Sequence, residues 1–492
     1  DSMATHVPHK FKVPDGTKTL RLEFTHTPEH PGVGNIPHQL SISVYGPNGA
    51  RGTRHNNDDQ QPIISTNWAS PGYLSGPIEP GEWTVELDVH RILPPGSVDY
   101  QINVFCENDV TDSKAPMPFP MRPTSVRRRG PGWYTGDLHG HTYHSDGDFS
   151  PAEFLEEAWK RGYDFVALTD HNTQSAVPEI TSLAGEAMTI LGGVELTTFN
   201  GHAVVLGVNE WTEWRVKDGS SMSALASDLQ DRGALYIIAH PKSEGHPICT
   251  GCRWAFSDMM PGPARHVEVW NRGWAGSHNE PGLRQFYKWL NEGFRMVASS
   301  GTDSHRPMPL EVRIGANRVY AHDNTQHEIL AGLRRGHCFV TSGPEISFTA
   351  ETEDSKASMG DLVKPGQLKL KMGWSIGLNG FDPSDLEAVL IKNNEAFGRW
   401  SCGDHEDSEF FRCGLVWPLR SRQQRHLFRL ISSSQSFFRS LDGPDSLGLS
   451  EGVLWPLKMK ILSRQQGWME IGRCALFSNT CFLISFLTLL QW

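Results

Sequence analysis

The chain of 492 residues is long enough to form two or three domains around a sizeable buried core. Its 38% hydrophobic content, together with 48 Gly and 32 Pro, excludes a disordered or fibrous protein and indicates a turn-rich globular one. A formal net charge of -11 argues against nucleic acid or an anionic membrane surface as a partner.

Eight cysteines in a chain of this length do not form the framework of a disulfide-rich secreted protein. Cys249 and Cys252 alone have a suggestive spacing, for which we expect a loop disulfide or two packed thiols rather than a structural zinc site. A soluble cytoplasmic protein is slightly favoured. A secreted protein is the alternative, because the chain begins with Asp1 rather than Met. The sequence does not indicate an oligomeric state.

The N-terminal part, residues 10–112, shows the alternation of apolar and polar side chains that is typical of half-buried β-strands. The clearest runs are residues 20–24, 40–45 and 83–89, and turns rich in Gly and Pro separate them. Short strands with turns between them predict an antiparallel β-sandwich domain. We find no catalytic constellation in it and expect a packing or binding module.

A linker rich in Pro, Ser and Arg is predicted over residues 113–132, and strands and helices alternate after it. A helix is expected from Pro151 to Arg161, with Ser150 as its N-cap. Repeated β–α units over residues 133–345 predict an α/β fold with a parallel barrel. A small β unit is predicted over residues 346–400. Residues 401–492 form a tail of uncertain structure, without an apolar run long enough for a membrane anchor.

Residue types that bind metal ions fall at the ends of the predicted barrel strands. His139 and His141 stand at positions i and i+2 of one strand, so both imidazoles point to the same side. Asp146 lies in the loop beyond that strand, and His202 opens a neighbouring strand. The other candidates each end a strand-like run, namely His171, Glu195, His240, Asp303 and His305. Because the carboxyl ends of parallel barrel strands meet on one face, we expect these side chains to gather there.

The chemistry of these nine side chains indicates a metal cluster. Mixed histidine and carboxylate ligands favour zinc, manganese or iron over magnesium or calcium. Nine candidates exceed the roughly four ligands of one structural zinc ion. A lone histidine at a strand end is more often an ordinary hydrogen-bonding residue, but here the same placement recurs along the chain. We therefore predict two or three divalent transition-metal ions that share a carboxylate.

Ordered motifs run through residues 133–344. They are Asp137-Leu138-His139-x-His141 with Ser145-Asp146-Gly147, Thr169-Asp170-His171-Asn172-Thr173, Gly193-Val194-Glu195, Gly201-His202, His240-Pro241 and Asp303-Ser304-His305, with Glu268-Val269-Trp270-Asn271 and Thr341-Ser342-Gly343-Pro344 also included. This series resembles the PHP (polymerase and histidinol phosphatase) family. In detail it is similar to the CehA/McbA metallohydrolase branch, named for carbaryl hydrolase.

The resemblance implies a distorted (β/α)7 barrel with two or three metal ions. It assigns one ion to His139, His141, Glu195 and Asp303, and it makes Glu195 the bridge to a second ion on His202 and His240. It assigns a third ion to Asp146, His171 and His305. We expect Glu195, Asp303 and His305 to be the catalytic residues.

The expected activity is cleavage of an ester or phosphoester bond of a small molecule by a metal-bridged hydroxide, because metal binding lowers the pKa of water toward about 7. A phosphatase or phosphodiesterase needs cations beside the metals, for which the candidates are Lys242, Arg253, Arg272 and Arg306. A carboxyl- or carbamoyl-ester hydrolase uses apolar walls. Four aromatic residues tilt the prediction slightly that way, although core packing explains them equally well: Trp254, Phe256, Trp270 and Trp274. The non-enzymatic alternative is a metal-binding structural or interaction protein.

Overall fold

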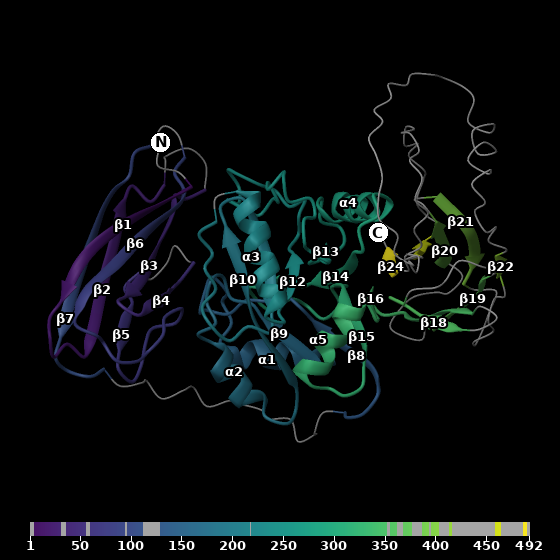
Figure 1. The fold of residues 1–492 in the computed structure, drawn as a ribbon, viewed down its shortest axis with the longest axis horizontal. Coiled ribbons are helices and arrows are strands. Elements are labelled where there is room, and N and C mark those ends of the chain that lie inside the picture. Colours follow the sequence, from purple (N-terminus) through teal and green to yellow (C-terminus); the bar gives the residue numbers. More distant parts are fainter. Residues whose placement is uncertain are drawn as a thin grey trace, which may run out of the picture. The chain divides into compact units, whose positions relative to one another are not determined.

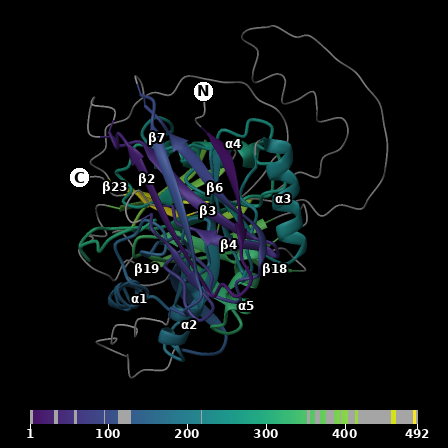
Figure 2. The same ribbon diagram turned by 90° about the vertical axis from the view of Figure 1, so that its left-hand side faces the viewer.

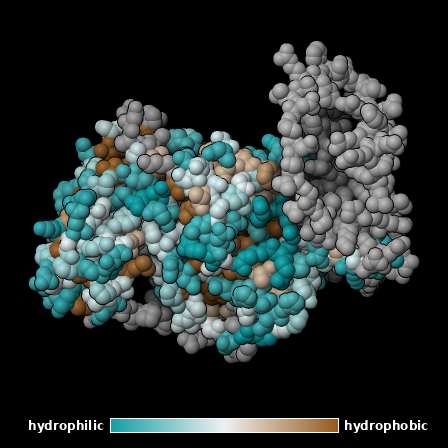
Figure 3. Space-filling view, in the orientation of Figure 1, coloured by the Kyte–Doolittle hydropathy of each residue, from teal (hydrophilic) through white to brown (hydrophobic). Residues whose placement is uncertain are grey.

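The computed structural model describes residues 4–30, 36–55, 60–93, 96–111, 128–216, 218–351, 355–361, 368–375, 386–392, 395–402, 413–415, 458–463 and 486–489. One compact unit includes Asp1–Ser342 and another consists of Gly343–Phe486. Most of the predicted linker and most of the predicted tail lie outside the described residues. Among the helices that are described, none is long and apolar enough to cross a membrane. On the face drawn in Figure 3, hydrophilic residues predominate and apolar residues form only small areas.

The described N-terminal residues form two antiparallel sheets (Figures 1 and 2). Their strands are β1 (Thr5–Val13), β2 (Thr19–Thr27), β3 (Gln39–Gly46), β4 (Gly49–Thr53), β5 (Ile63–Ser65), β6 (Gly81–Arg91) and β7 (Asp99–Glu107). One sheet has the order β1-β6-β3-β4 and the other β5-β2-β7. Leu20 and Leu22 of one sheet share a buried core with Ile42, Trp83 and Leu87 of the other. The alternation in the sequence therefore sorts apolar side chains into one shared core. We call this region the N-terminal sheets.

A mixed nine-stranded sheet dominates the rest of the first unit and has the order β14-β13-β12-β11-β10-β9-β8-β15-β16. Its strands are β8 (Gly132–Asp137), β9 (Phe165–Leu168), β10 (Thr189–Thr198), β11 (Gly201–Leu206), β12 (Leu235–Ile238), β13 (His266–Asn271), β14 (Val297–Gly301), β15 (Ala316–Ala321) and β16 (Cys338–Thr341). Because β14 also approaches β15 and β16, the sheet nearly closes into a barrel. The predicted α/β class is confirmed, and the (β/α)7 count stays a prediction.

The directions of the strands differ from the all-parallel prediction. β8, β9 and β10 pair in parallel, as do β12, β13 and β14. β11, however, is antiparallel to both β10 and β12. Only residues 199–200 join β10 to β11, and a parallel crossover needs a dozen or more residues. The start of β11 therefore lies beside the end of β10. His202 thus lies at the edge where the parallel strands end.

Five helices accompany this sheet within the described residues: α1 (Pro151–Lys160), α2 (Val177–Ala184), α3 (Gly219–Asp231), α4 (Asn279–Asn291) and α5 (Gln326–Arg335). The predicted cap of α1 is present, since the Ser150 hydroxyl accepts a hydrogen bond from the Glu153 backbone N–H and the Glu153 carboxylate accepts one from the Ser150 backbone N–H. Phe154, Leu155 and Ala158 form the buried face of this helix and belong to one core cluster with β9. The 3.6-residue period of the sequence thus fixes which face of α1 packs on the sheet.

The second unit is built from short strands: β17 (Glu345–Glu351), β18 (Lys356–Ser358), β19 (Leu368–Ser375), β20 (Leu386–Lys392), β21 (Glu395–Ser401), β22 (Cys413–Leu415) and β23 (Lys458–Ser463), and the chain has a further strand β24 (Phe486–Leu489). One antiparallel sheet has the order β18-β17-β19-β22, and β20 pairs with both β21 and β23. β19 and β20 lie within the small β unit that the sequence predicts over residues 346–400.

Candidate metal centre

The structure brings all nine predicted ligand residues together at one edge of the nine-stranded sheet. Their side chains form overlapping groups whose nitrogen and oxygen atoms lie within 4.8 Å of one another. One group is His139, His141, Glu195 and Asp303, a second is His141, Asp146, His171 and His305, a third is His171, Glu195 and His202, and a fourth joins His139 and His240 to Glu268. The nine predicted residues are therefore neighbours in space, and their individual roles as ligands stay predictions.

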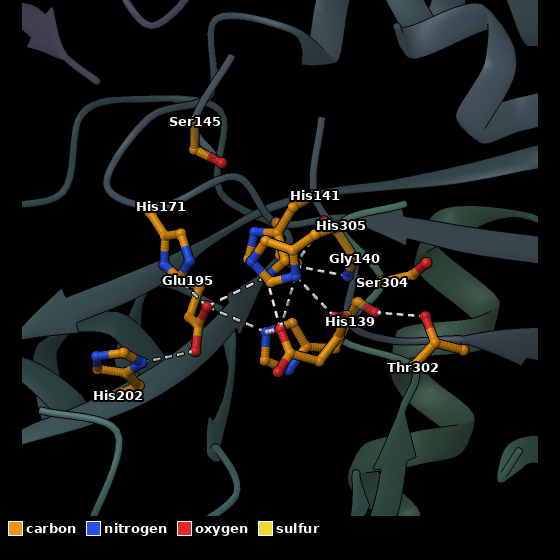
Figure 4. A network of polar contacts seen from close by, with 12 residues as sticks. His139, Gly140, His141, Ser145, His171, Glu195, His202, Thr302, Ser304 and His305 are labelled. Atoms are coloured by element: carbon orange, nitrogen blue, oxygen red, sulfur yellow. Dashed lines mark hydrogen bonds and ion pairs between the residues drawn. The ribbon is translucent and has the colours of Figure 1, made fainter. Parts of the chain in front are cut away.

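Glu195 lies among the histidines of this cluster, beside His171 and His202 (Figure 4). Its side chain is fully buried. Its Oε1 lies 3.1 Å from His202 Nδ1 and 3.0 Å from His240 Nε2. Its Oε2 lies 3.1 Å from His139 Nε2, 3.3 Å from His141 Nε2 and 3.0 Å from His171 Nδ1. The two oxygens of one carboxylate thus contact two different sets of imidazoles.

Two further carboxylates complete the cluster. Asp303 Oδ1 lies 3.0 Å from His141 Nε2 and 3.6 Å from His139 Nε2. Asp146 Oδ1 lies 3.1 Å from His305 Nε2 and 3.4 Å from His171 Nε2. Asp146 comes from the loop after β8, whereas His171 and His305 come from segments after β9 and β14. Three separate strand ends therefore meet around Asp146.

The side chains fit a bound metal cluster because buried ligand-type atoms are left without hydrogen bonds. Within the described part of the chain, His139 Nε2, Glu195 Oε2, Asp146 Oδ1 and His202 Nε2 are buried and make no hydrogen bond of acceptable geometry. Buried polar atoms in folded proteins are nearly always hydrogen-bonded, and unsatisfied ones call for an explanation such as an ion. Imidazole nitrogens and carboxylate oxygens suit zinc, manganese and iron.

The electrostatics of the cluster are those of a site built for cations. Burial alone would raise the pKa of Glu195, but His139, His171 and His202 hold it well below its ordinary value. Burial would lower the pKa of His139, yet Glu195, Glu268 and Asp303 raise it well above its ordinary value. The buried carboxylates therefore create a negative field that positive charge at the centre would offset.

Two buried aspartates that the sequence did not single out hold the ligand loops. Asp137 accepts hydrogen bonds from the backbone N–H groups of Thr302 at 2.9 Å and His139 at 3.3 Å. Asp170 accepts bonds from the Thr142 backbone N–H at 2.7 Å and from the Ser145 hydroxyl at 2.8 Å. Burial raises the pKa of each carboxyl to about 6, although these hydrogen bonds by themselves would lower it. Asp137 stands two residues before His139 and Asp170 directly before His171, and this position in the motifs is what could have identified them from the sequence.

Glu268 on β13 is the residue of the cluster that was not among the predicted ligands. Its Oε1 lies 3.2 Å from His139 Nδ1, and its Oε2 accepts a hydrogen bond from the His240 backbone N–H at 2.9 Å. Glu268 is 4% exposed, and its neighbours Val267 and Val269 are buried apolar residues. An acid between two valines of a strand was the available signal, because such a buried charge needs a partner.

Backbone strain is concentrated at this centre. Five non-glycine residues of the described chain have positive φ, and four of them belong to the centre or its immediate surroundings: Asn172, His240, Arg272 and Asp303. Such conformations cost of order 1–3 kcal/mol each and persist where the surroundings over-determine them, which is common at functional sites. The strain supports a functional role for this edge of the sheet.

The loop around residues 249–252 supports His240. Cys249 and Cys252 form a disulfide, which was one of the two predicted alternatives. The Cys252 carbonyl oxygen lies 3.1 Å from His240 Nδ1, so that this nitrogen donates and Nε2 is left to face Glu195. The loop therefore selects the orientation of one predicted ligand.

The aromatic residues predicted as apolar walls are core residues instead. Trp254, Phe256, Trp270 and Trp274 are all buried. Trp254 donates its indole N–H to the Met259 carbonyl oxygen, and Trp270 packs edge-on against Trp274 with ring centroids 5.0 Å apart. Their large apolar surfaces are satisfied within the fold. They therefore give no support to an apolar substrate pocket.

Among the basic residues predicted near the mouth, Arg272 contacts a predicted ligand. Its guanidinium lies 3.1 Å from Asp303 Oδ2, and its side chain is 55% exposed. Arg253 donates to the Ser243 carbonyl oxygen, and Arg306 lies 3.7 Å from the exposed Asp148. Arg272 therefore combines contact with the centre and access to solvent.

The chain resembles known proteins over limited segments. No family model matches it. An uncharacterized protein of Methanocaldococcus jannaschii is 32% identical over 125 residues, which cover 23% of this chain and 69% of the archaeal protein. The 5'-3' exoribonuclease Rnm of Salmonella typhimurium is 36% identical over 78 residues, 15% of this chain and 27% of the enzyme. A 5'-3' exoribonuclease of Haemophilus influenzae is 36% identical over 76 residues, 28% of that enzyme.

At this identity over more than two thirds of its length, the chain belongs to the same family as the archaeal protein, whose description gives no activity. By contrast, it spans only about a quarter of the Salmonella and Haemophilus exoribonucleases.

Solved structures align with parts of this chain at low identity. A two-domain protein of Bacteroides vulgatus, described as containing a PHP-like metal-dependent phosphoesterase, aligns with a TM-score of 0.37 at 14% identity and covers 61% of this chain and 91% of its own. A protein of Bifidobacterium adolescentis that is described as a metal-dependent phosphoesterase aligns with a TM-score of 0.27 at 18% identity and covers 35% of this chain and 87% of its own. TM-scores this low do not establish a common fold.

Proposed function

We propose that the protein is a metal-dependent hydrolase of the PHP superfamily that cleaves phosphoester bonds of small molecules. The observation that carries this proposal is the position of Glu195, whose two carboxylate oxygens contact different sets of histidines. A carboxylate shared in this way suits two neighbouring ions, because one side chain then offsets the charge of both. The distorted (β/α)7 barrel and the CehA/McbA branch remain predictions within this proposal.

In this proposal the side chains divide into three ligand sets. They are His139, His141 and Asp303 with one oxygen of Glu195; His202 and His240 with its other oxygen; and Asp146, His171 and His305. Ions bound there would lower the pKa of water and stabilise the charge that develops on the substrate. Glu195 and Asp303 supply the negative charge that keeps cations close together. His305 has the most exposed imidazole of the set, at 20%, and is therefore the histidine best placed to meet a substrate oxygen.

A phosphoester is favoured over a carboxyl or carbamoyl ester by the surroundings of the ligands. Arg272 places a guanidinium beside Asp303, and such a group can bind two oxygens of a phosphate. The aromatic residues that favoured the ester alternative are buried in the core. The relatives named as 5'-3' exoribonucleases point in the same direction. The net charge of -11 argues against nucleic acid itself, so we propose a small phosphoester.

We expect the purified protein to contain two or three transition-metal ions per chain and to hydrolyse aryl phosphates faster than aryl esters. Elemental analysis after growth with added manganese, zinc and iron measures the first, and a parallel screen of both substrate series measures the second. One ion or none per chain would refute the cluster. A full complement of ions with faster hydrolysis of aryl esters would instead support the carboxyl- or carbamoyl-ester alternative. Full occupancy without turnover of either series would support the non-enzymatic one.

Arg272→Gln is expected to raise KM for aryl phosphates about fivefold to tenfold. The substitution removes the charge-assisted hydrogen bond that we propose between the guanidinium and the substrate phosphate, at a position where the side chain is 55% exposed. The KM for a neutral aryl ester should change little. Arg232→Gln is the matched control, because that side chain is also 55% exposed and pairs with an aspartate, Asp228 of α3, that is not a predicted ligand. Equal effects of Arg272→Gln on charged and neutral substrates would show that Arg272 acts on Asp303 alone.

A further inference from the structure

The N-terminal sheets reach the candidate metal centre through the residues that follow β4. The Arg54 guanidinium donates from Nε to the Tyr143 carbonyl oxygen at 3.0 Å. Tyr143 lies in the short loop between the predicted ligands His141 and Asp146. This hydrogen bond therefore holds the loop that delivers Asp146 to the cluster.

A second contact holds the segment that carries His171. The Thr173 hydroxyl donates to the Gly72 carbonyl oxygen at 2.9 Å, and the Gly72 backbone N–H donates to the Ser175 hydroxyl at 3.0 Å. Gly72 has φ +90°, and a Cβ there would lie 2.6 Å from the Thr53 carbonyl oxygen and 3.0 Å from the His144 carbonyl oxygen. A side chain at Gly72 would therefore collide with Thr53 within the N-terminal sheets and crowd the backbone of the ligand loop at His144.

The ring of His55 packs directly on the imidazole of His171. The two ring centroids are 4.8 Å apart, and His55 is 8% exposed. Two further contacts fix the ring of His55. It packs edge-on against His90, with 4.5 Å between the ring centroids, and the amide nitrogen of Gln39 lies 2.9 Å from His55 Nε2. A rigid ring against His171 restricts the orientations that this predicted ligand can adopt.

These contacts share one target. They act on the Tyr143 loop, on the Thr173 segment and on the ring of His171, and thus on Asp146 and His171 of the third ligand set. By contrast, the bonds that hold His139 and His240, from Glu268 and Cys252, come from within the barrel region. The Asp146 loop is also held by Asp170 of the barrel region, and Arg91 of β6 donates to the Pro247 and Ile248 carbonyl oxygens just before Cys249. The third ligand set is nevertheless the one whose loop and ring the N-terminal sheets contact directly.

We propose that the N-terminal sheets are a structural part of the metal centre, and that Arg54, His55 and Gly72 are positioning residues for the ion held by Asp146, His171 and His305. The inference rests on the proposed function, because it assumes that this set binds an ion. The N-terminal sheets are accordingly needed for full metal occupancy. Loss of their contacts releases the third ion selectively, while the ions around Glu195 stay bound.

The test compares the metal content and metal affinity of Arg54→Ala and Gly72→Ala with those of the wild-type protein. We expect each variant to bind its weakest ion roughly 10- to 100-fold less tightly, or to lose one ion per chain on dialysis against a chelator, with the others retained. Arg51→Ala is the control for the arginine, since Arg51 donates to Leu74, Gly76 and Pro77 within the N-terminal sheets. Gly16→Ala is the control for the glycine, since it has φ +83° and no atom within 4 Å of an added Cβ.

A double-mutant comparison makes the test selective. In a His171→Ala background, which already lacks one ligand of the third set, Arg54→Ala should have no further effect on the remaining ions. Unchanged occupancy and affinity in both single variants would overturn the inference, and so would the loss of all ions together. A wild-type protein with two ions would overturn it while leaving the proposed function intact. A wild-type protein with no ions would overturn both.

Discussion

Glu195→Gln is expected to weaken the binding of two ions together and to lower the rate of hydrolysis by more than about 100-fold, while the fold stays intact. The substitution keeps the shape of the side chain but removes its negative charge. In the protein, Oε1 faces His202 and His240 while Oε2 faces His139, His141 and His171. A glutamine amide offers one oxygen and one NH2 group, so it can bind on one side only.

The measurement is metal content by elemental analysis, together with the rate on an aryl phosphate and the melting temperature of each protein. Glu292→Gln is a suitable control, because that glutamate is 44% exposed at the end of α4 and pairs with Lys288 rather than with a predicted ligand. Full metal occupancy with near-normal turnover in Glu195→Gln would make Glu195 a structural residue. The shared-carboxylate mechanism would then have to be abandoned.

The convergence of the ligand-type residues could be predicted because it depends on local patterns. Short apolar runs indicate buried strands, and each of His171, Glu195 and Asp303 follows or ends such a run. The carboxyl ends of parallel strands meet at one edge, so residues far apart in sequence were expected to become neighbours. His202 joins the cluster for a different reason, namely the tight turn that makes β11 antiparallel.

What the sequence could not provide were the contacts that hold the ligands in place. Arg54 and Tyr143 are separated by 89 residues, and no local pattern links a residue after β4 to a loop after β8. The buried aromatic residues were hard to interpret for a different reason, since the sequence alone does not distinguish an aromatic residue of a pocket wall from one of the core. Trp270 donates its indole N–H to the Arg272 carbonyl oxygen, a satisfied position that only the fold reveals.

Glu268 is the buried residue, missed as a functional residue from the sequence, whose contacts matter most for the predicted metal ligands. Its two oxygens serve different groups, the ring of His139 and the backbone N–H of His240. The site is also tightly packed, since a Cβ at Gly301 would lie 2.1 Å from Glu268 Oε1 and 2.3 Å from His139 Cβ. Glu268 therefore controls the orientation of one predicted ligand in each of the two sets that share Glu195.

Glu268→Ala is expected to lower metal affinity by roughly 100-fold and Glu268→Gln by roughly 10-fold, because groups that orient ligands typically contribute in this range. Alanine leaves both the His139 ring N–H and the His240 backbone N–H unsatisfied in the interior, at about 1–3 kcal/mol for each donor. Glutamine can accept from one of them, but its NH2 group then faces the other donor. Chelator competition measures the affinity, and thermal unfolding of the metal-free proteins measures the structural part. If Glu268→Ala binds its ions within twofold of wild type, His139 and His240 are oriented by the packing around them, and Glu268 only fills space beside Gly301.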